Sequence, residues 1–587
     1  MKQLMLGNKA VARGLYEAGV CFVSSYPGTP STEITEEAVK YDDIYCEWAP
    51  NEKVAMESAF GASLAGKRSF CAQKHVGLNV AADPLYTMSY TGVNAGMVIG
   101  VADDAGMHSS QNEQDSRHHA IAAKVPMLEP SDSAEALEYT KIAYEISEEF
   151  DTPVLLKMCT RVAHSQSVTE TGNRVEHDKP YEKTISKYVM TPANAKKRHP
   201  FVEERTKKLI AYAEKSPLNR IEKGSRPIGV ITSSTSYQYV KEVFGDDIYV
   251  LKLGMVNPLP DQLIRDFAAM VEKLYVVEEL DPIFENHIKA LGISVIGKDA
   301  LPMIDEFSQN LVAEALGEKA PEGLAFNEEI PVRPPIMCSG CPHRGLFYTL
   351  KKLGCTVLGD IGCYTLGAAP PLGAMEMTLC MGASIGATHG FNKMRGAESE
   401  HKTVAVIGDS TFMHSGMTGL ANVAYNQTNS TVIILDNSIT GMTGHQQNPT
   451  TGYNIKGDPA GKINLEALVR AMGFERVSVI DPYNLTQCEE TIKQELAADA
   501  PSIIISRRPC ALLKYVKHNP PLSVDINKCI GCKSCMRIGC PSISMKTTAG
   551  KTHASVDATQ CVGCGVCTGL CPVGAFSGVD AKGGENK

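Results

Sequence analysis

The C-terminal part of the chain contains the run CIGCKSCMRIGCP at residues 529–541 and the run CVGCGVCTGLCP at residues 561–572. Each run has three cysteines separated by two residues, followed by a fourth cysteine and a proline, which is the spacing with which thiolates hold a 4Fe-4S cubane. In two-cluster modules of this kind, the fourth cysteine of one run serves the other cluster. The spacing therefore predicts a small α+β module of the bacterial ferredoxin type with two 4Fe-4S clusters.

We expect the two ligand sets to exchange their last members. The first predicted set is Cys529, Cys532, Cys535 and Cys571, and the second is Cys561, Cys564, Cys567 and Cys540. The first run departs from the standard spacing, because four residues rather than three precede its last cysteine. Zinc ribbons use paired Cys-x2-Cys units, and disulfide frameworks are typical of small secreted chains, so both are disfavoured.

The bulk properties narrow the class of protein. The chain has 587 residues and a formal net charge of −9, so we expect several domains and no general binding of nucleic acid. The first residues lack the apolar core of a signal peptide, and no apolar run is long enough to cross a membrane. Because cluster cysteines also need a reducing compartment, we expect a soluble, cytoplasmic protein.

Helix and strand patterns alternate to about residue 515 and predict α/β architecture with doubly wound parallel sheets. We expect a first α/β domain at 1–165, a polar, lysine-rich linker with some helix at 166–222 and a compact doubly wound domain at 223–320. After a proline-rich break, a second large α/β domain is expected at 330–515 and the cluster module at 520–587.

Oxygen-bearing side chains follow two neighbouring predicted strands of the second large domain. The strand at 403–407 ends at Gly408-Asp409-Ser410, and the strand at 431–435 ends at Asp436-Asn437. Because ligands bind at the carboxyl ends of parallel strands, Asp409, Asn437 and the backbone carbonyl near Ile439 are candidates to hold Mg²⁺. A simple turn after the strand is the alternative.

This segment resembles the thiamine diphosphate motif, in which Gly-Asp-Gly is followed by Asn-Asn. The resemblance implies that the turn at 408–410 and Asn437 bind the diphosphate with Mg²⁺. Ser410 stands where the motif has glycine and Asp436 where it has asparagine, while both metal-ligand positions are kept.

A glutamate begins a helix of small residues in the first domain. Glu52 follows Asn51 and stands nine residues before Gly61. This resembles the pyrimidine-binding domain of thiamine enzymes, which implies that Glu52 is catalytic and hydrogen-bonds the aminopyrimidine ring of the cofactor. An acidic residue stabilised by the helix dipole is the alternative interpretation.

Further polar loops of this domain suggest a substrate site. The loop Tyr26-Pro27-Gly28-Thr29-Pro30-Ser31 looks like the substrate loop of 2-oxoacid:ferredoxin oxidoreductases, which implies that Thr29 binds the oxoacid group. Ser31 is also expected to cap the helix that follows. Lys74, His75 and Arg117 lie after apolar strands, where each is compatible either with binding a substrate carboxylate or with a structural role.

Four further cysteines form a separate pattern. Cys338 and Cys341 open the second large domain, Cys363 follows a glycine, and Cys510 lies at the end of the domain. In pyruvate:ferredoxin oxidoreductases a similar pattern holds a cluster beside the thiamine, and the resemblance implies a third 4Fe-4S cluster here. A zinc site, a redox pair or inert buried cysteines are the alternatives.

The order of these parts resembles the large (α) subunits of indolepyruvate:ferredoxin oxidoreductases, within the 2-oxoacid:ferredoxin oxidoreductase superfamily, over nearly the whole chain. The resemblance implies a pyrimidine domain, a transketolase-C-like domain, a diphosphate domain and a ferredoxin module. The implied reaction is oxidative decarboxylation of an aryl 2-oxo acid with CoA, which yields aryl-acetyl-CoA, CO₂ and electrons for ferredoxin. Because a γ domain is absent from this sequence, a smaller β partner in a heterodimer or a dimer of heterodimers is also implied.

Other functions stay open at this point. The same chemistry on pyruvate, 2-oxoglutarate or branched-chain 2-oxo acids fits the motifs equally well. A non-catalytic electron-transfer subunit is a second alternative, although it would not need Glu52 or Asp409. A simple thiamine decarboxylase is disfavoured, since it has no use for the cluster module.

Overall fold

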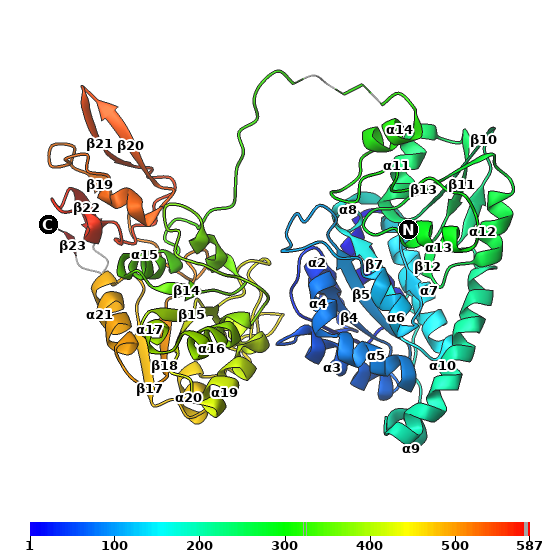
Figure 1. Cartoon of the computed structure of the whole chain (residues 1–587), viewed down its shortest axis with the longest axis horizontal. Helices are drawn as coiled ribbons and strands as arrows, with labels where there is room; N and C mark the ends of the chain where they lie inside the picture. The colour runs from blue at the N-terminus through cyan, green and yellow to red at the C-terminus, as the bar shows by residue number, and fades with distance from the viewer. Residues whose placement is uncertain (321, 324–325, 580–584, 587) are drawn as a thin grey trace. The chain divides into compact units, whose positions relative to one another are not determined.

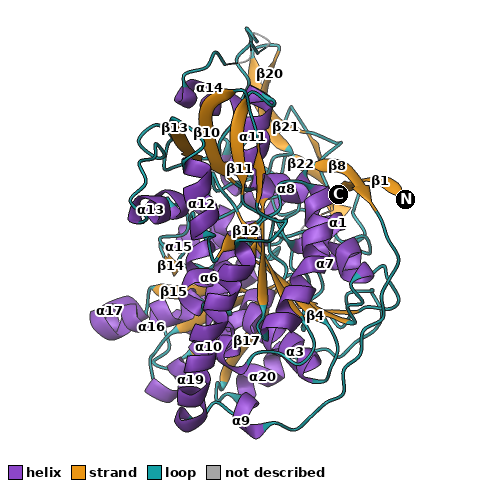
Figure 2. Ribbon diagram, turned by 90° about the vertical axis from the view of Figure 1, so that its right-hand side faces the viewer, coloured by secondary structure: helices purple, strands orange, loops and turns teal. Residues whose placement is uncertain are grey.

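The computed structural model describes residues 1–320, 322–323, 326–579 and 585–586. The chain forms two compact units, Met1–Asn327 and Glu328–Lys587. Helices and strands alternate through both units, and the large sheets are mostly parallel, which confirms the predicted α/β class (Figures 1 and 2). The division into five segments stays a prediction. Among the described helices, none combines the length and apolar character needed to cross a lipid bilayer.

The first unit is built around a seven-stranded sheet. In spatial order its strands are β12 (Met255–Asn257), β6 (Met127–Leu128), β7 (Val154–Cys159), β5 (Met97–Asp103), β4 (Ser69–Lys74), β2 (Phe22–Ser25) and β3 (Tyr45–Trp48). All neighbours are parallel except β12 and β6. Every residue of β5 is buried, as expected for a central parallel strand that helices cover on both faces.

Helices connect and cover these strands (Figure 1). They are α1 (Gly7–Glu17), α2 (Thr32–Ala38), α3 (Glu52–Leu64), α4 (His75–Val80), α5 (Ala82–Thr91), α6 (Arg117–Ala123), α7 (Ser133–Phe150), α8 (Thr160–His164), α9 (Ile185–Tyr188) and α10 (Pro192–Ala213). Strands β1 (Lys2–Leu6) and β8 (Gln166–Glu170) form a separate antiparallel pair. The segment predicted as a linker, 166–222, therefore contributes two strands, β8 and β9 (Arg220–Glu222), the short helix α9 and the long helix α10 to this unit.

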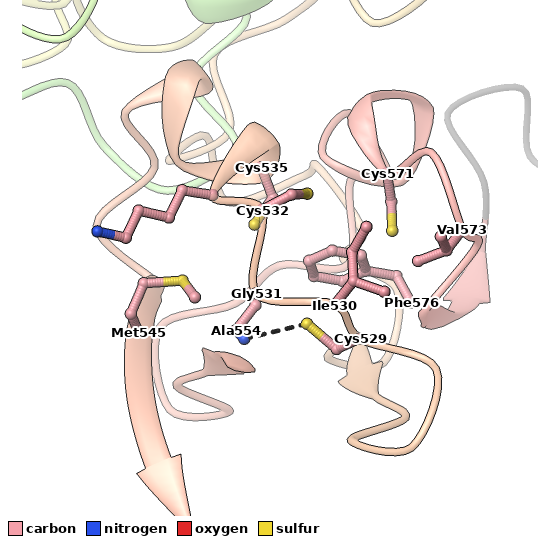
Figure 3. Close-up of a pocket in the computed structure, with 11 residues that line it drawn as sticks. Cys529, Ile530, Gly531, Cys532, Cys535, Met545, Ala554, Cys571, Val573 and Phe576 are labelled. Carbon is pink, nitrogen blue, oxygen red and sulfur yellow. Dashed lines mark hydrogen bonds between the residues drawn. The ribbon is translucent and has the colours of Figure 1, made fainter. Parts of the chain in front are cut away.

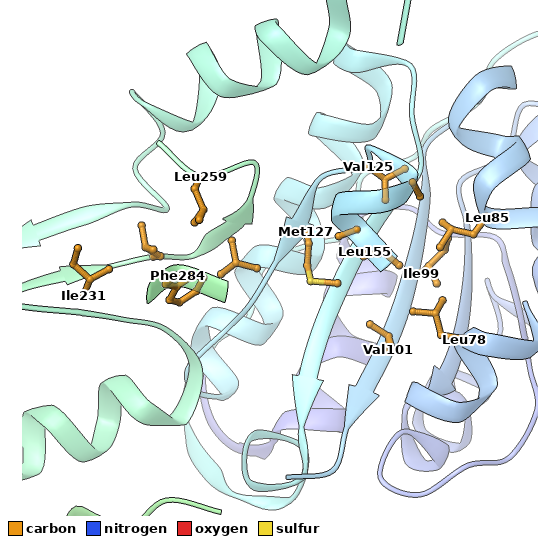
Figure 4. Close-up of a cluster of buried hydrophobic side chains, with 14 of the residues drawn as sticks. Leu78, Leu85, Ile99, Val101, Val125, Met127, Leu155, Ile231, Leu259 and Phe284 are labelled. Carbon is orange, nitrogen blue, oxygen red and sulfur yellow. The ribbon is translucent and has the colours of Figure 1, made fainter. Parts of the chain in front are cut away.

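A four-stranded sheet completes the first unit. Its order is β13 (Lys273–Val277), β10 (Arg226–Thr232), β11 (Ile248–Lys252) and β9 (Arg220–Glu222), with α11 (Ser234–Phe244), α12 (Asp261–Ala268), α13 (Ile283–Ala290) and α14 (Gln309–Leu316). One hydrophobic cluster runs from this sheet into the larger one: Figure 4 shows Ile231 and Phe284 on one side and Ile99 and Leu155 on the other. The segments at 1–165 and 223–320 thus share a core.

The second unit contains a five-stranded, fully parallel sheet. Its order is β14 (Thr356–Leu358), β15 (Thr403–Gly408), β16 (Thr431–Asp436), β18 (Ser502–Arg507) and β17 (Arg476–Ile480). The helices of this part are α15 (His343–Leu353), α16 (Ala383–Arg395), α17 (Ala397–Glu400), α18 (Asp409–Thr411), α19 (Met417–Asn426), α20 (Leu465–Ala471) and α21 (Leu485–Leu496). Two separate hydrophobic clusters pack against the sheet, because residues alternate between its faces.

The C-terminal module has little regular structure. Strand β19 (Ser523–Val524) pairs with β22 (Phe576–Val579), which pairs with β23 (Glu585–Asn586), and β20 (Ile543–Thr548) forms a hairpin with β21 (Lys551–Val556). Two short helices, η3 (Ser534–Ile538) and η4 (Thr568–Leu570), each precede the last cysteine of a run. Its core combines the buried cysteines Cys529, Cys535 and Cys567 with apolar side chains such as Leu522, Ile543 and Phe576.

Candidate active site and cluster ligands

Glu52 lies at the start of α3 with its position fixed from two sides. Asn51 occupies the N-cap and accepts a hydrogen bond from the Val54 amide at 2.9 Å, which holds the first turn. The Glu52 side chain is only 5% exposed. Gly77 in α4 packs directly on it, since a Cβ at that position would lie 2.7 Å from Glu52 Cγ and Oε1. The carboxyl group is therefore buried and closely confined.

Lys74 interacts with this glutamate, and Thr29 is linked to Lys74 through Ser109. Lys74 is the last residue of β4. Its Nζ donates a hydrogen bond to the Ser109 carbonyl at 2.9 Å, and its charge interacts with that of Glu52. Burial lowers the pKa of Lys74, against the opposing effect of Asp104 and Glu52. Ser109 Oγ in turn donates to the Thr29 carbonyl at 3.5 Å. Ser109 thus links Thr29 to Lys74, and Lys74 in turn interacts with Glu52.

Ser31 and His75, two further residues singled out in the sequence, each lie against a backbone carbonyl. Ser31 stands at the N-cap of α2, but its hydroxyl donates to the Gly28 carbonyl at 2.9 Å, so the predicted side-chain cap is wrong. His75 begins α4, and Nε2 lies 3.2 Å from the Asn112 carbonyl. Burial and the charge of Lys74 lower the pKa of His75 to about 4, so the ring is neutral at pH 7, and its contact with a substrate carboxylate stays a prediction.

Arg117 lies in a buried ion-pair cluster. Its guanidinium donates to Asp115 at 2.6 Å and to Glu278 at 2.7 Å, and it is 2% exposed. It also donates to the Asp281 carbonyl at 2.9 Å and lies over the Phe284 ring. These partners join the two sheets of the first unit, which favours the structural alternative for Arg117, while its role in substrate binding stays a prediction.

In the second unit, three oxygen-bearing groups converge at the ends of β15 and β16. One terminal atom of the Asn437 amide lies 3.2 Å from Asp409 Oδ1 and 2.8 Å from the Ile439 carbonyl oxygen. An oxygen at that position faces only acceptors unless a cation lies among them, whereas a nitrogen there would donate to both. Octahedral Mg²⁺ holds its oxygens at about 2.1 Å, which puts neighbouring oxygens about 3 Å apart. These residues therefore fit the cation that the motif predicts.

Asp409 is strongly perturbed by its surroundings. Burial raises its pKa to about 7, and the nearby carboxylate of Asp436 adds to this effect. Its carboxylate accepts hydrogen bonds from the Ser410 amide at 2.8 Å and from Thr450 Oγ1 at 3.1 Å. Gly408 precedes it with no space for a side chain, because a Cβ would lie 2.8 Å from the Tyr364 ring. A divalent cation would relieve the cost of the buried charge.

The four cysteines predicted as a third cluster site are brought together from distant parts of the sequence. Cys341 interacts electrostatically with Cys338 and Cys363, and Cys363 with Cys338 and Cys510. Burial raises the pKa of Cys341 to about 12 and that of Cys363 to about 11. The Cys510 amide donates to the Asn437 carbonyl at 2.9 Å, so this set adjoins the magnesium candidate.

The C-terminal module contains two hollows lined by cysteines. One, shown in Figure 3, is lined by Cys529, Cys532, Cys535 and Cys571, and the other by Cys540, Cys561, Cys564 and Cys567. Each has about 300 Å³ of empty space, part of it open to solvent. The last cysteine of each run therefore lies with the first three of the other run, as the predicted exchange requires.

The second hollow also adjoins the four cysteines predicted to hold a third cluster. This four-cysteine set consists of Cys338, Cys341, Cys363 and Cys510. Ser339 and Gly340, which separate Cys338 from Cys341, contribute to its wall. A Cβ on Gly340 would lie 2.3 Å from Val562 Cγ2, so the two loops are in close contact. Among the described residues, no three His, Cys, Asp or Glu side chains are arranged around a single metal ion.

Sequence reasoning missed several residues that shape these sites. Gly77 confines Glu52, Thr450 hydrogen-bonds Asp409, and Arg344 lies between the two groups of cysteines. Only Arg344 left a signal, because it directly follows the Cys-Pro-His segment.

Comparison with known families agrees with this geometry. Residues 13–224 match the thiamine diphosphate-binding domain of pyruvate flavodoxin/ferredoxin oxidoreductases. Residues 360–506 match the C-terminal thiamine pyrophosphate-binding domain of thiamine pyrophosphate enzymes, and residues 528–575 match the 4Fe-4S dicluster domain. Glu52, Asp409 and the C-terminal cysteines each lie inside one of these matched ranges.

Relatives align with the chain from end to end. The indolepyruvate oxidoreductase subunit IorA of Archaeoglobus fulgidus is 39% identical over 93% of this chain and 97% of its own length. The subunit of the same name from Thermococcus kodakarensis is 41% identical over 98% of this chain and 96% of its own length. With such identity across all its domains, the chain belongs to the IorA family of indolepyruvate oxidoreductase subunits, within the 2-oxoacid:ferredoxin oxidoreductases.

Proposed function

We propose that this chain, with a smaller partner subunit, catalyses the thiamine diphosphate- and CoA-dependent oxidative decarboxylation of aryl 2-oxo acids to aryl-acetyl-CoA and CO₂. Ferredoxin would accept the electrons. The observation that carries the proposal is the position of the four-cysteine set. Its loop between Cys338 and Cys341 lines the wall of a cluster hollow, while Cys510 adjoins the diphosphate motif.

The residues of the chain have distinct roles in this proposal. Bound thiamine diphosphate would supply the electron sink that decarboxylation needs. Asp409, Asn437 and the Ile439 carbonyl would hold Mg²⁺ against its diphosphate. Glu52 would hydrogen-bond the aminopyrimidine and hold its proton, in a pocket that excludes water. We assign Lys74 to the substrate carboxylate, since its ammonium group is buried near Glu52, with Thr29 beside it.

The proposed electron route follows the order of the cysteines in space. A third cluster on the set that contains Cys363 would receive single electrons next to the diphosphate motif. The cluster that contains Cys540 would follow, since Ser339 and Gly340 line its hollow. Cys567 of that set interacts electrostatically with Cys535 of the last set, from which ferredoxin would be reduced.

The names of the relatives support the finer assignments. Their name specifies indolepyruvate, which supports an aryl substrate, and describes each as a subunit, which supports a separate partner. We expect that partner to supply the γ-type domain, in a heterodimer or a dimer of heterodimers.

The test uses the complex purified without oxygen. Viologen reduction is measured with indolepyruvate, phenylpyruvate, pyruvate and 2-oxoglutarate, each with and without CoA. Preference for the two aryl acids together with CoA dependence is the expected result. Preference for pyruvate or 2-oxoglutarate would keep the reaction and reject the substrate class. No reduction by protein that retains thiamine diphosphate and iron would indicate an electron-transfer role only.

A further inference from the structure

Arg344 is a buried arginine at the contact between the four-cysteine set and the cluster module. It is the second residue of α15 and is 5% exposed. Its Nε donates to the Cys338 carbonyl at 3.0 Å, and its Nη2 donates to the Met337 carbonyl. From the same guanidinium, Nη1 donates to the carbonyls of Ile538, at 3.3 Å, and Gly539. One side chain thus joins the loop at Met337–Cys338 to the loop at Ile538–Gly539.

These hydrogen bonds leave the charge of Arg344 without an ordinary partner. All four acceptors are neutral backbone carbonyls, and within the described part of the chain Arg344 forms no ion pair with a carboxylate. A buried, unpaired cation is costly in free energy. The cysteines whose thiolate forms act on it most strongly are Cys341, Cys540, Cys338 and Cys564, which belong to two different sets.

We infer that Arg344 is a positioning residue whose buried charge is shared by the cluster on Cys540, Cys561, Cys564 and Cys567 and the cluster proposed on Cys338, Cys341, Cys363 and Cys510. A 4Fe-4S cubane with four thiolates is negatively charged, and it becomes more negative when it is reduced. A nearby cation in a water-poor site therefore favours the reduced form. Arg344 raises the reduction potentials of both clusters and holds their loops together.

The second half of this inference rests on the proposed third cluster, but the first half does not. The 4Fe-4S dicluster match covers Cys540, Cys561, Cys564 and Cys567. The potential of that cluster can be measured by reductive titration without any substrate. A failure of the proposed reaction would therefore leave this test intact.

The experiment compares the complex of wild-type protein with R344M, R344K and R537M. Arg537 is an exposed arginine that acts on Cys532, so R537M removes a solvent-screened charge near the other hollow. Each complex is purified anaerobically, its iron is measured, and its clusters are titrated with a mediated reductant while electron paramagnetic resonance spectra are recorded.

We expect R344M to shift the one-electron reduction equilibrium of the Cys540 cluster at least tenfold toward the oxidised form, about 59 mV. R537M and R344K should stay within threefold of the wild type, the latter because lysine keeps the charge. R344M with full iron and a potential within threefold of the wild type would overturn the inference. A tenfold shift in R344K would also overturn the inference, because that variant keeps the charge. If R344M fails to retain its iron, the potential of R344K is the test.

Discussion

The contact between Gly77 and Glu52 can be tested with a single added methyl group. In G77A the new Cβ would lie 2.7 Å from Glu52 Cγ and Oε1, whereas ordinary contact between carbon atoms begins at about 3.4 Å. The carboxyl must therefore retreat by about 0.7 Å. A displacement of this order at a catalytic group lowers activity by about 100-fold. Overpacking costs about 1–3 kcal/mol, and the better helix propensity of alanine returns up to about 1 kcal/mol.

Activity and stability should thus respond very differently to G77A. Viologen reduction with the best substrate measures the first, and thermal unfolding of the complex measures the second. G61A is the matched control, since Gly61 lies in the same helix as Glu52 and its Cβ would have no neighbour within 4 Å. G61A should keep wild-type activity. If G77A retained more than half of the wild-type activity, the reasoning about Glu52 would be wrong; equal losses in both variants would implicate the helix instead.

Four further predictions address the other sites. E52Q should abolish turnover while iron content stays normal, and near-normal turnover would remove Glu52 as the activating residue. Since the pKa of Asp409 is raised from 3.8 to about 7, the free energy of unfolding of the unliganded protein should fall as the pH rises between these values. For the same reason, Mg²⁺ binding at pH 6 should release a proton. D409N should remove the first effect, measured by chemical unfolding, and the second, measured by calorimetry. G340A should weaken attachment of the cluster module, seen as faster proteolysis of the full chain, whereas G354A, at a similar positive φ but with no neighbour within 4 Å, should not. Iron analysis should give about twelve iron atoms per chain, and about eight in C338S; about eight in both would reject the third cluster.

Strong local patterns in the sequence predicted the elements that carry chemistry. The strand expected at 403–407 is β15, one residue longer, and the strand expected at 431–435 is β16, also one residue longer. The helix expected after Asn51 begins at Glu52. Such segments were predictable because their apolar runs, caps and turns are encoded by neighbouring residues. The cysteine spacing was informative for the same reason.

Pairings between distant residues could not be predicted in this way. Arg117 forms its ion pair with Glu278, 161 residues away, and Arg344 hydrogen-bonds Gly539, 195 residues away. The contact of Gly77 with Glu52 likewise depends on how two helices pack. Nothing in the local sequence distinguishes an arginine that binds a substrate from one that joins two sheets, because only the folded chain brings its partners near.

The order of strands in the second unit explains why cofactor ligands and cluster ligands adjoin. Strands β14, β15, β16 and β18 are consecutive and parallel, so their carboxyl ends lie along one edge of the sheet. From that edge the chain presents Cys363 after β14, Asp409 after β15, Asn437 after β16 and Cys510 after β18. The register pairs Asp436 with Arg507, which carries the segment with Cys510 to the Asn437 carbonyl. In our proposal, therefore, one sheet topology places the site of substrate oxidation next to the cluster that first accepts the electrons. A change in the order of these strands would separate the two sites even if every motif were kept.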